Sequence, residues 1–126
     1  ELHTRTELAT RQGADLFVSI HCNASVTNPQ AAGIYTAAYS RESEGWNLSQ
    51  RLRQSMAEST GAADLGGEER PELAVLRTAT MPAALVECGF MSTPEELSLL
   101  AWPEYQTRLA RGIADGILAC LEGAGQ

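Results

Sequence analysis

Two short apolar segments, each followed by an ionisable residue, constrain the fold of this 126-residue sequence most strongly. Residues 16–20 lead into His21 and Asn23, and residues 82–86 lead into Glu87. Apolar runs of this length that are closed by polar residues are typical of buried strands in an α/β sheet. Ligands of such sheets gather beyond the carboxyl ends of the strands. An imidazole and a carboxylate delivered there suggest a metal-assisted hydrolase.

Helical patterns alternate with these strands along the chain. We expect strands at 16–20, 33–39, 73–76 and 82–86, helices at 4–12 and 43–59, helix starts at 92–96 and 102–104, and a polar loop at 61–72. The last helix carries an apolar stripe that should face the core: Leu109, Ile113, Ile117 and Leu121. The alternation predicts an α/β fold with a mainly parallel sheet and helices packed on both faces.

Composition excludes several classes of function. The net charge is −7 and the sequence contains no lysine, which argues against an electrostatic nucleic-acid binder. The longest apolar runs are strand-sized, so no membrane insertion is expected, and no signal peptide is visible. Three cysteines, at 22, 88 and 120, have neither metal-ligand spacing nor the even number of a disulfide framework. These values are typical of one globular domain or most of one.

Both candidate site residues also admit purely structural interpretations. His21 is either a metal ligand or a core histidine held by a backbone carbonyl. Glu87 is either a general base or one half of an ion pair with an arginine such as Arg77. Burying a carboxylate after an apolar run is costly unless the group is paired or functional. The position of each residue at a strand end favours the functional interpretation for both.

A resemblance to a known family rests on two ordered motifs. Residues 14–24, which contain SIHCNA, and residues 76–92, which contain LVECGF, closely resemble the zinc-dependent N-acetylmuramoyl-L-alanine amidases. The resemblance implies hydrolysis of the amide bond between N-acetylmuramic acid and L-alanine in peptidoglycan, outside the cytoplasm. It also implies that His21 is a zinc ligand, that Glu87 is the catalytic glutamate acting as general base and acid on a zinc-activated water, and that Asn23 is a supporting residue.

The family's two other zinc ligands, a histidine and a glutamate, precede the segment matched here by Arg5. The resemblance therefore implies that residues 1–126 are the C-terminal portion of a single amidase catalytic domain whose opening strand and helix are missing. We expect the chain alone to be inactive for that reason. His3 and Glu7, four residues apart, are an alternative ligand pair.

Three other functions stay open at this stage. Cys88 and His21 together would suggest a cysteine nucleophile, although both Cys22 and Cys88 are expected to be small buried apolar residues. A second possibility is an inactive remnant that binds peptidoglycan or a regulatory partner. A third is a different metal-dependent hydrolase on a similar scaffold, because a fold does not determine a function.

Overall fold

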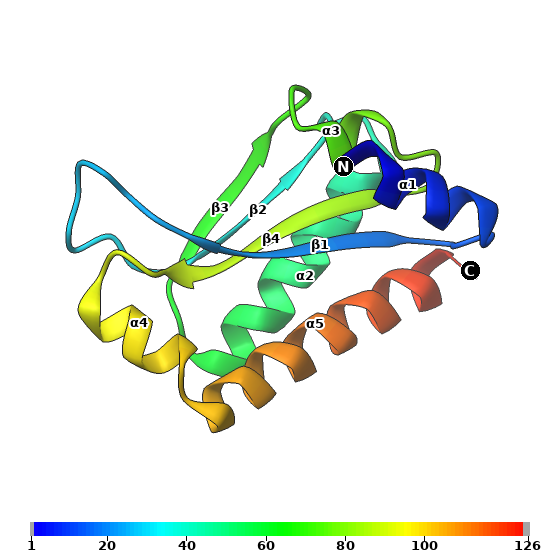
Figure 1. Ribbon diagram of the computed structural model, residues 1–126. Helices are drawn as coiled ribbons and strands as arrows, with labels where there is room; N and C mark the ends of the chain where they lie inside the picture. The colour runs from blue at the N-terminus through cyan, green and yellow to red at the C-terminus, as the bar shows by residue number, and fades with distance from the viewer. Residues whose placement is uncertain (1, 125–126) are drawn as a thin grey trace.

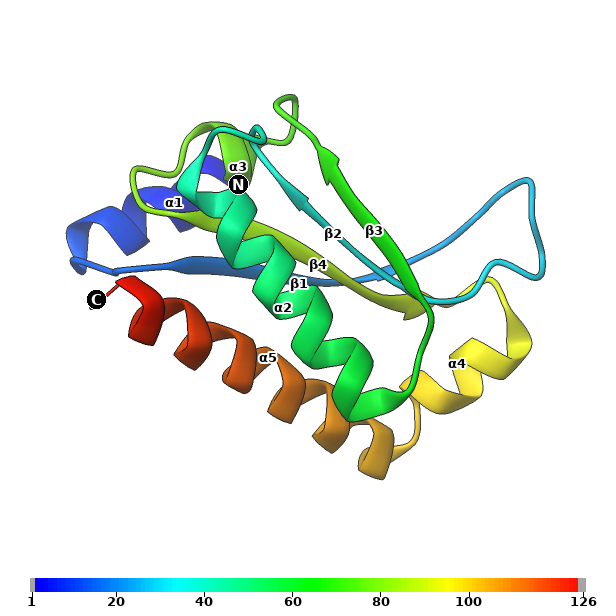
Figure 2. The ribbon, with the colours of Figure 1, turned by 180° about the vertical axis from the view of Figure 1, so that it is seen from behind.

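The computed structural model describes the backbone of residues 2–124 and the side chains of residues 4–123. Figure 1 shows α2 and α5 on one side of a sheet and α1 and α3 on the other, and Figure 2 shows the same layers from behind. The elements are α1 (Leu2–Arg11), β1 (Phe17–Asn23), β2 (Ile34–Ala38), α2 (Glu44–Thr60), β3 (Asp64–Glu69), α3 (Ala74–Arg77), β4 (Ala83–Phe90), α4 (Pro94–Leu100) and α5 (Pro103–Ala124).

The sheet has the strand order β1-β4-β2-β3. β1 pairs with β4 and β2 pairs with β3 in parallel, whereas the central pair β2 and β4 is antiparallel. The predicted α/β fold with a mainly parallel sheet is confirmed, and the antiparallel centre is a feature that the sequence pattern did not indicate. No helix within the described range has the length and apolarity that crossing a bilayer requires.

The core has two parts, one on each face of the sheet. The larger lies between the sheet, α2 and α5, and contains Ile34, Leu48, Leu52, Met56, Ala84, Val86, Cys88, Tyr105, Leu109, Ile113 and Cys120. The smaller lies under α3 and contains Ala37, Val75, Leu76, Ala83 and Leu85. Successive residues of β4 belong to different parts, so this strand is buried on both faces, as its continuous apolar sequence predicts.

One residue of the predicted stripe on α5 lies outside the core. Leu109 and Ile113 are buried and Ile117 packs against them, but Leu121 is 42% exposed. Leu121, in the last turn of α5, lines an open hollow beside Leu16 and Pro82, the residues that precede β1 and β4, so the prediction for Leu121 is wrong.

Strand β3 occupies the segment that was predicted to be a polar loop. Its sequence, DLGGEE, lacks the apolar alternation that marks a strand, since β3 is an edge strand with its side chains half-buried or exposed. A charge contact helps to hold it: Arg53 Nε of α2 lies 2.6 Å from Asp64 Oδ1. Arg53 Nη1 also donates to Thr36 Oγ1 of β2 at 3.1 Å.

Residues 73–76, predicted as a short strand, belong instead to a helical turn. The Arg77 amide donates to the Leu73 carbonyl at 2.9 Å, and the Thr78 amide donates to the Ala74 carbonyl at 2.9 Å. A four-residue apolar run does not distinguish strand from helix by periodicity. The helical turn places Val75 and Leu76 in the smaller core.

Helices α2 and α5 approach closely at Gly112 and Gly116, which yields a stability prediction. A Cβ at Gly116 would lie 2.8 Å from Leu52 Cα and 3.1 Å from the Arg51 carbonyl oxygen, so the α2 backbone would have to shift. Gly116→Ala is therefore expected to destabilise the fold by roughly 1–3 kcal/mol, the cost of overpacking, despite the better helix propensity of alanine.

Thermal unfolding checks this prediction as a lower Tm for Gly116→Ala. Gly123→Ala on the same helix is the matched control, because its nearest neighbour is the flexible end of Arg51 at 3.4 Å. An unchanged Tm for Gly116→Ala would show that the two helices separate without cost.

Candidate active site

The sheet brings His21 and Glu87 together. They are Cα partners in the parallel pairing of β1 with β4. The register of this pairing shifts directly after them, between His21 and Asn23. Alternate residues of a strand share a face, so Glu87 lies on the face of Leu85, under α3, and His21 lies on the face of Ser19. The histidine and the glutamate therefore stand side by side on one face, near the carboxyl ends of both strands.

The Glu87 carboxylate is buried and incompletely paired. The residue is 8% exposed, and Oε2 has no hydrogen-bond partner within the described residues. Burial raises the pKa of Glu87, and the Arg70 guanidinium lowers it in part. A buried carboxylate with an unpaired oxygen and a raised pKa has the properties that a general base needs.

Tyr35 and Arg70 line the other side of Glu87. Tyr35 of β2 is the antiparallel Cα partner of Glu87. Arg70 Nη1 donates to the Tyr35 hydroxyl at 3.3 Å, and Arg70 Nε lies 3.1 Å from each carboxylate oxygen of Glu72. Burial and the nearby Glu87 carboxylate raise the pKa of Tyr35, so its hydroxyl stays protonated. Glu87 therefore has the Tyr35 hydroxyl group as a polar neighbour on β2, and the Arg70 guanidinium lies next to that hydroxyl.

His21 is exposed, and one of its ring nitrogens is occupied. Nε2 lies 2.8 Å from Ser19 Oγ, while Nδ1 has no hydrogen-bond partner within the described part of the chain. A backbone carbonyl does not hold the ring, which argues against the interpretation of His21 as a core histidine.

The turns around the site are fixed by polar side chains. Glu96 of α4 is 7% exposed, and its Oε1 accepts the amides of Gly33 at 2.9 Å and Phe90 at 3.0 Å. Asn23 Oδ1 accepts the amide of the next residue, Ala24, at 2.8 Å. Glu96 thus ties the start of β2 to the end of β4, the strand that carries Glu87.

The proposed ion pair between Glu87 and Arg77 is absent from the described contacts. Arg77 Nη1 donates instead to the Glu72 carbonyl at 2.9 Å. No group of three or more potential metal-ligating side chains occurs among the residues that the structure describes. Glu7 lines a hollow between α1 and α3, and the side chain of His3 lies outside the described residues, so their pairing remains a hypothesis.

The cysteines do not form a nucleophilic site. Cys88 is buried, and burial raises the pKa of its thiol to about 12, with Cys22 and Glu87 adding to the shift. Such a thiol stays protonated at neutral pH and is a poor nucleophile. Cys22 is exposed, so the prediction that both cysteines are buried is wrong for this one.

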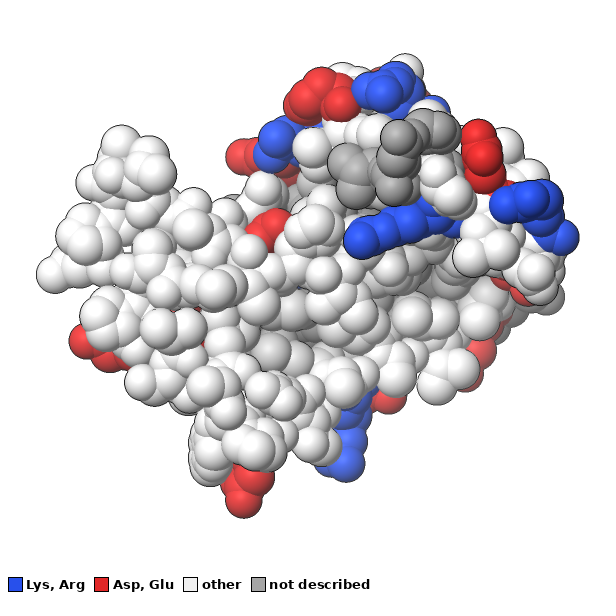
Figure 3. Space-filling model, viewed as in Figure 1, with Lys and Arg blue, Asp and Glu red and all other residues white. Residues whose placement is uncertain are grey.

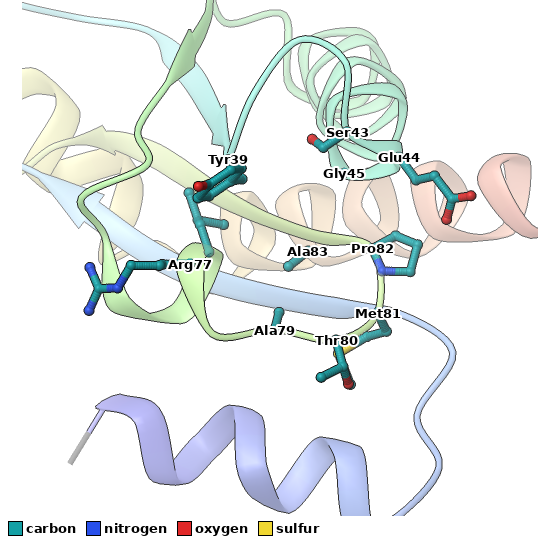
Figure 4. A pocket seen from close by; sticks show the side chains of 11 residues that line it. Tyr39, Ser43, Glu44, Gly45, Arg77, Ala79, Thr80, Met81, Pro82 and Ala83 are labelled. Atoms are coloured by element: carbon teal, nitrogen blue, oxygen red, sulfur yellow. The ribbon is translucent and has the colours of Figure 1, made fainter.

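A hollow of about 330 Å³ lies at the other end of β4 (Figure 4). It is lined by Ala83 at the start of β4 and by residues of α2 and α3. Figure 4 shows the charged groups of Arg77 and Glu44 on opposite sides of it. Since no ionisable groups converge there, the chemistry-bearing end of β4 is the one with Glu87.

The surface beside the site carries little charge. Figure 3 shows acidic and basic side chains gathered over α1 and near β3 and α3, whereas the surface over β1 and the loop at 24–32 is largely uncharged. The loop contains no charged residue. This face has no basic patch of the kind that binds nucleic acids.

Both the structure and the sequence match known proteins. The structure matches the N-acetylmuramoyl-L-alanine amidase from Clostridium difficile 630 with a TM-score of 0.91 and 36% identity, over 97% of this chain and 66% of that chain. It matches the amidase AmiC2 of Nostoc punctiforme with a TM-score of 0.90 and 35% identity, over the same shares of 97% and 66%. The fold is therefore that of the solved N-acetylmuramoyl-L-alanine amidases.

The sequence matches the Amidase_3 family, N-acetylmuramoyl-L-alanine amidase, over residues 1–119, and the chain belongs to this family. The germination-specific N-acetylmuramoyl-L-alanine amidase of Bacillus subtilis strain 168 is 28% identical over 118 residues, 94% of this chain and 49% of the relative. The chain thus spans about half the length of this curated relative.

Proposed function

We propose that this chain is the C-terminal part of a zinc-dependent amidase domain that hydrolyses the bond between N-acetylmuramic acid and L-alanine in peptidoglycan, outside the cytoplasm. The observation that carries the proposal is the register of His21 with Glu87 in a member of the amidase family. Support for a larger domain comes from β1, an edge strand within the described sheet, whose Ile20 is 60% exposed.

The side chains present fit part of a zinc site. His21 offers an exposed imidazole with a free Nδ1, and Glu87 offers a buried carboxylate oxygen without a partner. Catalytic zinc sites use three protein ligands, with an open position for water. His21 would be one ligand, and we propose that the other two come from outside the described residues.

Zinc, when bound, supplies a Lewis acid that polarises the amide carbonyl and acidifies water. Glu87 would take a proton from the attacking water and later return it to the leaving amine of L-alanine. Its burial keeps this proton from bulk solvent, and the Arg70 guanidinium lowers the pKa of the carboxylate in part. The Tyr35 hydroxyl lies on the same face and is available to hold the substrate beside Glu87.

Purified sacculi test the function directly. The zinc-loaded full-length protein is expected to release new L-alanine amino termini, detected by amine labelling, and chelation of zinc is expected to abolish the release until zinc is restored. Binding without release would favour an inactive remnant. Release of other amino groups or of reducing ends would indicate a different hydrolase.

A further inference from the structure

Ser19 is a buried residue beside the proposed zinc ligand. It precedes His21 by two residues on β1, on the same face of the strand, and is 6% exposed. Its Oγ lies 2.8 Å from His21 Nε2. Within the described residues, this is the one hydrogen bond of the His21 ring.

The two nitrogens of this ring are consequently inequivalent. A neutral imidazole carries one N–H and one lone pair, and a metal binds the lone pair. Binding zinc through Nε2 would break the bond to Ser19 and leave a buried hydroxyl unpaired, which costs free energy. Binding through Nδ1 keeps that bond, with Nε2–H donating to Ser19 Oγ.

We propose that Ser19 is a positioning residue that holds the His21 ring in the tautomer and orientation in which Nδ1 binds zinc. This inference rests on the proposed function, since it takes His21 to be a zinc ligand. Partners of this kind fix the ring of a metal-binding histidine and raise its basicity, and losing one typically weakens metal affinity by roughly 10- to 100-fold.

The first test is zinc affinity, measured by competition with a chromophoric chelator on the full-length protein. Ser19→Ala is expected to bind zinc roughly 10- to 100-fold more weakly. Ser19→Thr keeps the hydroxyl and suits a strand, so it is expected to stay within about threefold of the parent. Ser49→Ala is the matched control: Ser49 is fully buried, and its hydroxyl donates to the Trp46 carbonyl of α2, away from His21.

Equal zinc affinity of Ser19→Ala and the parent would overturn the inference, as would an equal loss in Ser49→Ala. His21→Ala separates this failure from failure of the proposed site. If His21→Ala loses zinc while Ser19→Ala retains it, only the role of Ser19 is wrong. If His21→Ala retains zinc, the proposed site itself is wrong.

The second test needs no substitution at Ser19, so its result does not depend on how a Ser19 variant folds. Long-range ¹H–¹⁵N spectra of the zinc-loaded protein report which histidine nitrogen carries the metal and which carries the proton, with His21 assigned from the spectrum of His21→Gln. We expect zinc on Nδ1 and a proton on Nε2. Zinc on Nε2 would overturn the inference.

Discussion

Glu87→Gln is expected to lower kcat for release of L-alanine termini by about 100-fold or more, the scale of a lost general base, while zinc content stays that of the parent. Glutamine keeps the size of the side chain and the hydrogen bonding of one oxygen, but it does not accept a proton at neutral pH. Turnover within a few-fold of the parent would remove Glu87 from the mechanism.

Stability measured on the same variant separates a catalytic role from a structural one. Burial raises the pKa of Glu87, so the folded state holds its proton more tightly than the unfolded state does. The free energy of unfolding therefore falls as pH rises through the two pKa values, and the cost of the buried charge is fully present above the folded-state pKa. Glu87→Gln removes that cost and is expected to unfold at the same or a higher temperature than the parent.

A variant with lower stability and lower activity together would instead indicate a structural carboxylate. Glu58→Gln, an exposed glutamate of α2, is the control and is expected to change neither property. A group that costs stability at its own position yet is needed for turnover is the expected pattern for an active site.

The strands that carry the site could be predicted from the sequence because both are strongly apolar. β4 is buried on both faces, so its run of apolar residues ending at Glu87 was visible without any periodicity. β3 could not be found in the same way, since it lies at the edge of the sheet and three of its four exposed positions hold aspartate or glutamate. The apolar run at 73–76 was too short to distinguish a strand from the turn of α3.

The residues around His21 and Glu87 also differ in how far the sequence predicted them. Ser19 lies two residues from His21 on one strand, so the alternation of side chains placed it on the same face, although its contact with the ring was not predicted. Arg70 and Glu96 reach the site from other elements, Arg70 from the residue after β3 and Glu96 from α4. Arg70 follows a strand that the pattern did not reveal, and Glu96 appeared only as an acidic residue in the first turn of α4. Contacts between different elements depend on the order of the strands in the sheet, which the hydrophobic pattern of the sequence does not predict.

His21→Ala is expected to lower zinc occupancy and activity together, in contrast to Glu87→Gln. If His21 is one of three protein ligands, as proposed, its removal leaves an incomplete site, and the metal would dissociate at concentrations where the parent is loaded. The measurement is zinc per protein after dialysis, alongside the release of L-alanine termini. Because His21 is exposed and lies outside both parts of the core, the fold of the metal-free protein is expected to be little changed.

His3→Ala provides the matched control, because His3 is the other histidine of the sequence. If His21 is the ligand, His3→Ala retains zinc and activity while His21→Ala loses both. If His3 and Glu7 form the ligand pair instead, His3→Ala loses zinc. Unchanged zinc stoichiometry in His21→Ala would contradict the role of His21, and Glu87 would then need a different partner for its chemistry. The contrast between zinc loss at His21 and zinc retention at Glu87 assigns a ligand and a base to two residues that the sheet places side by side.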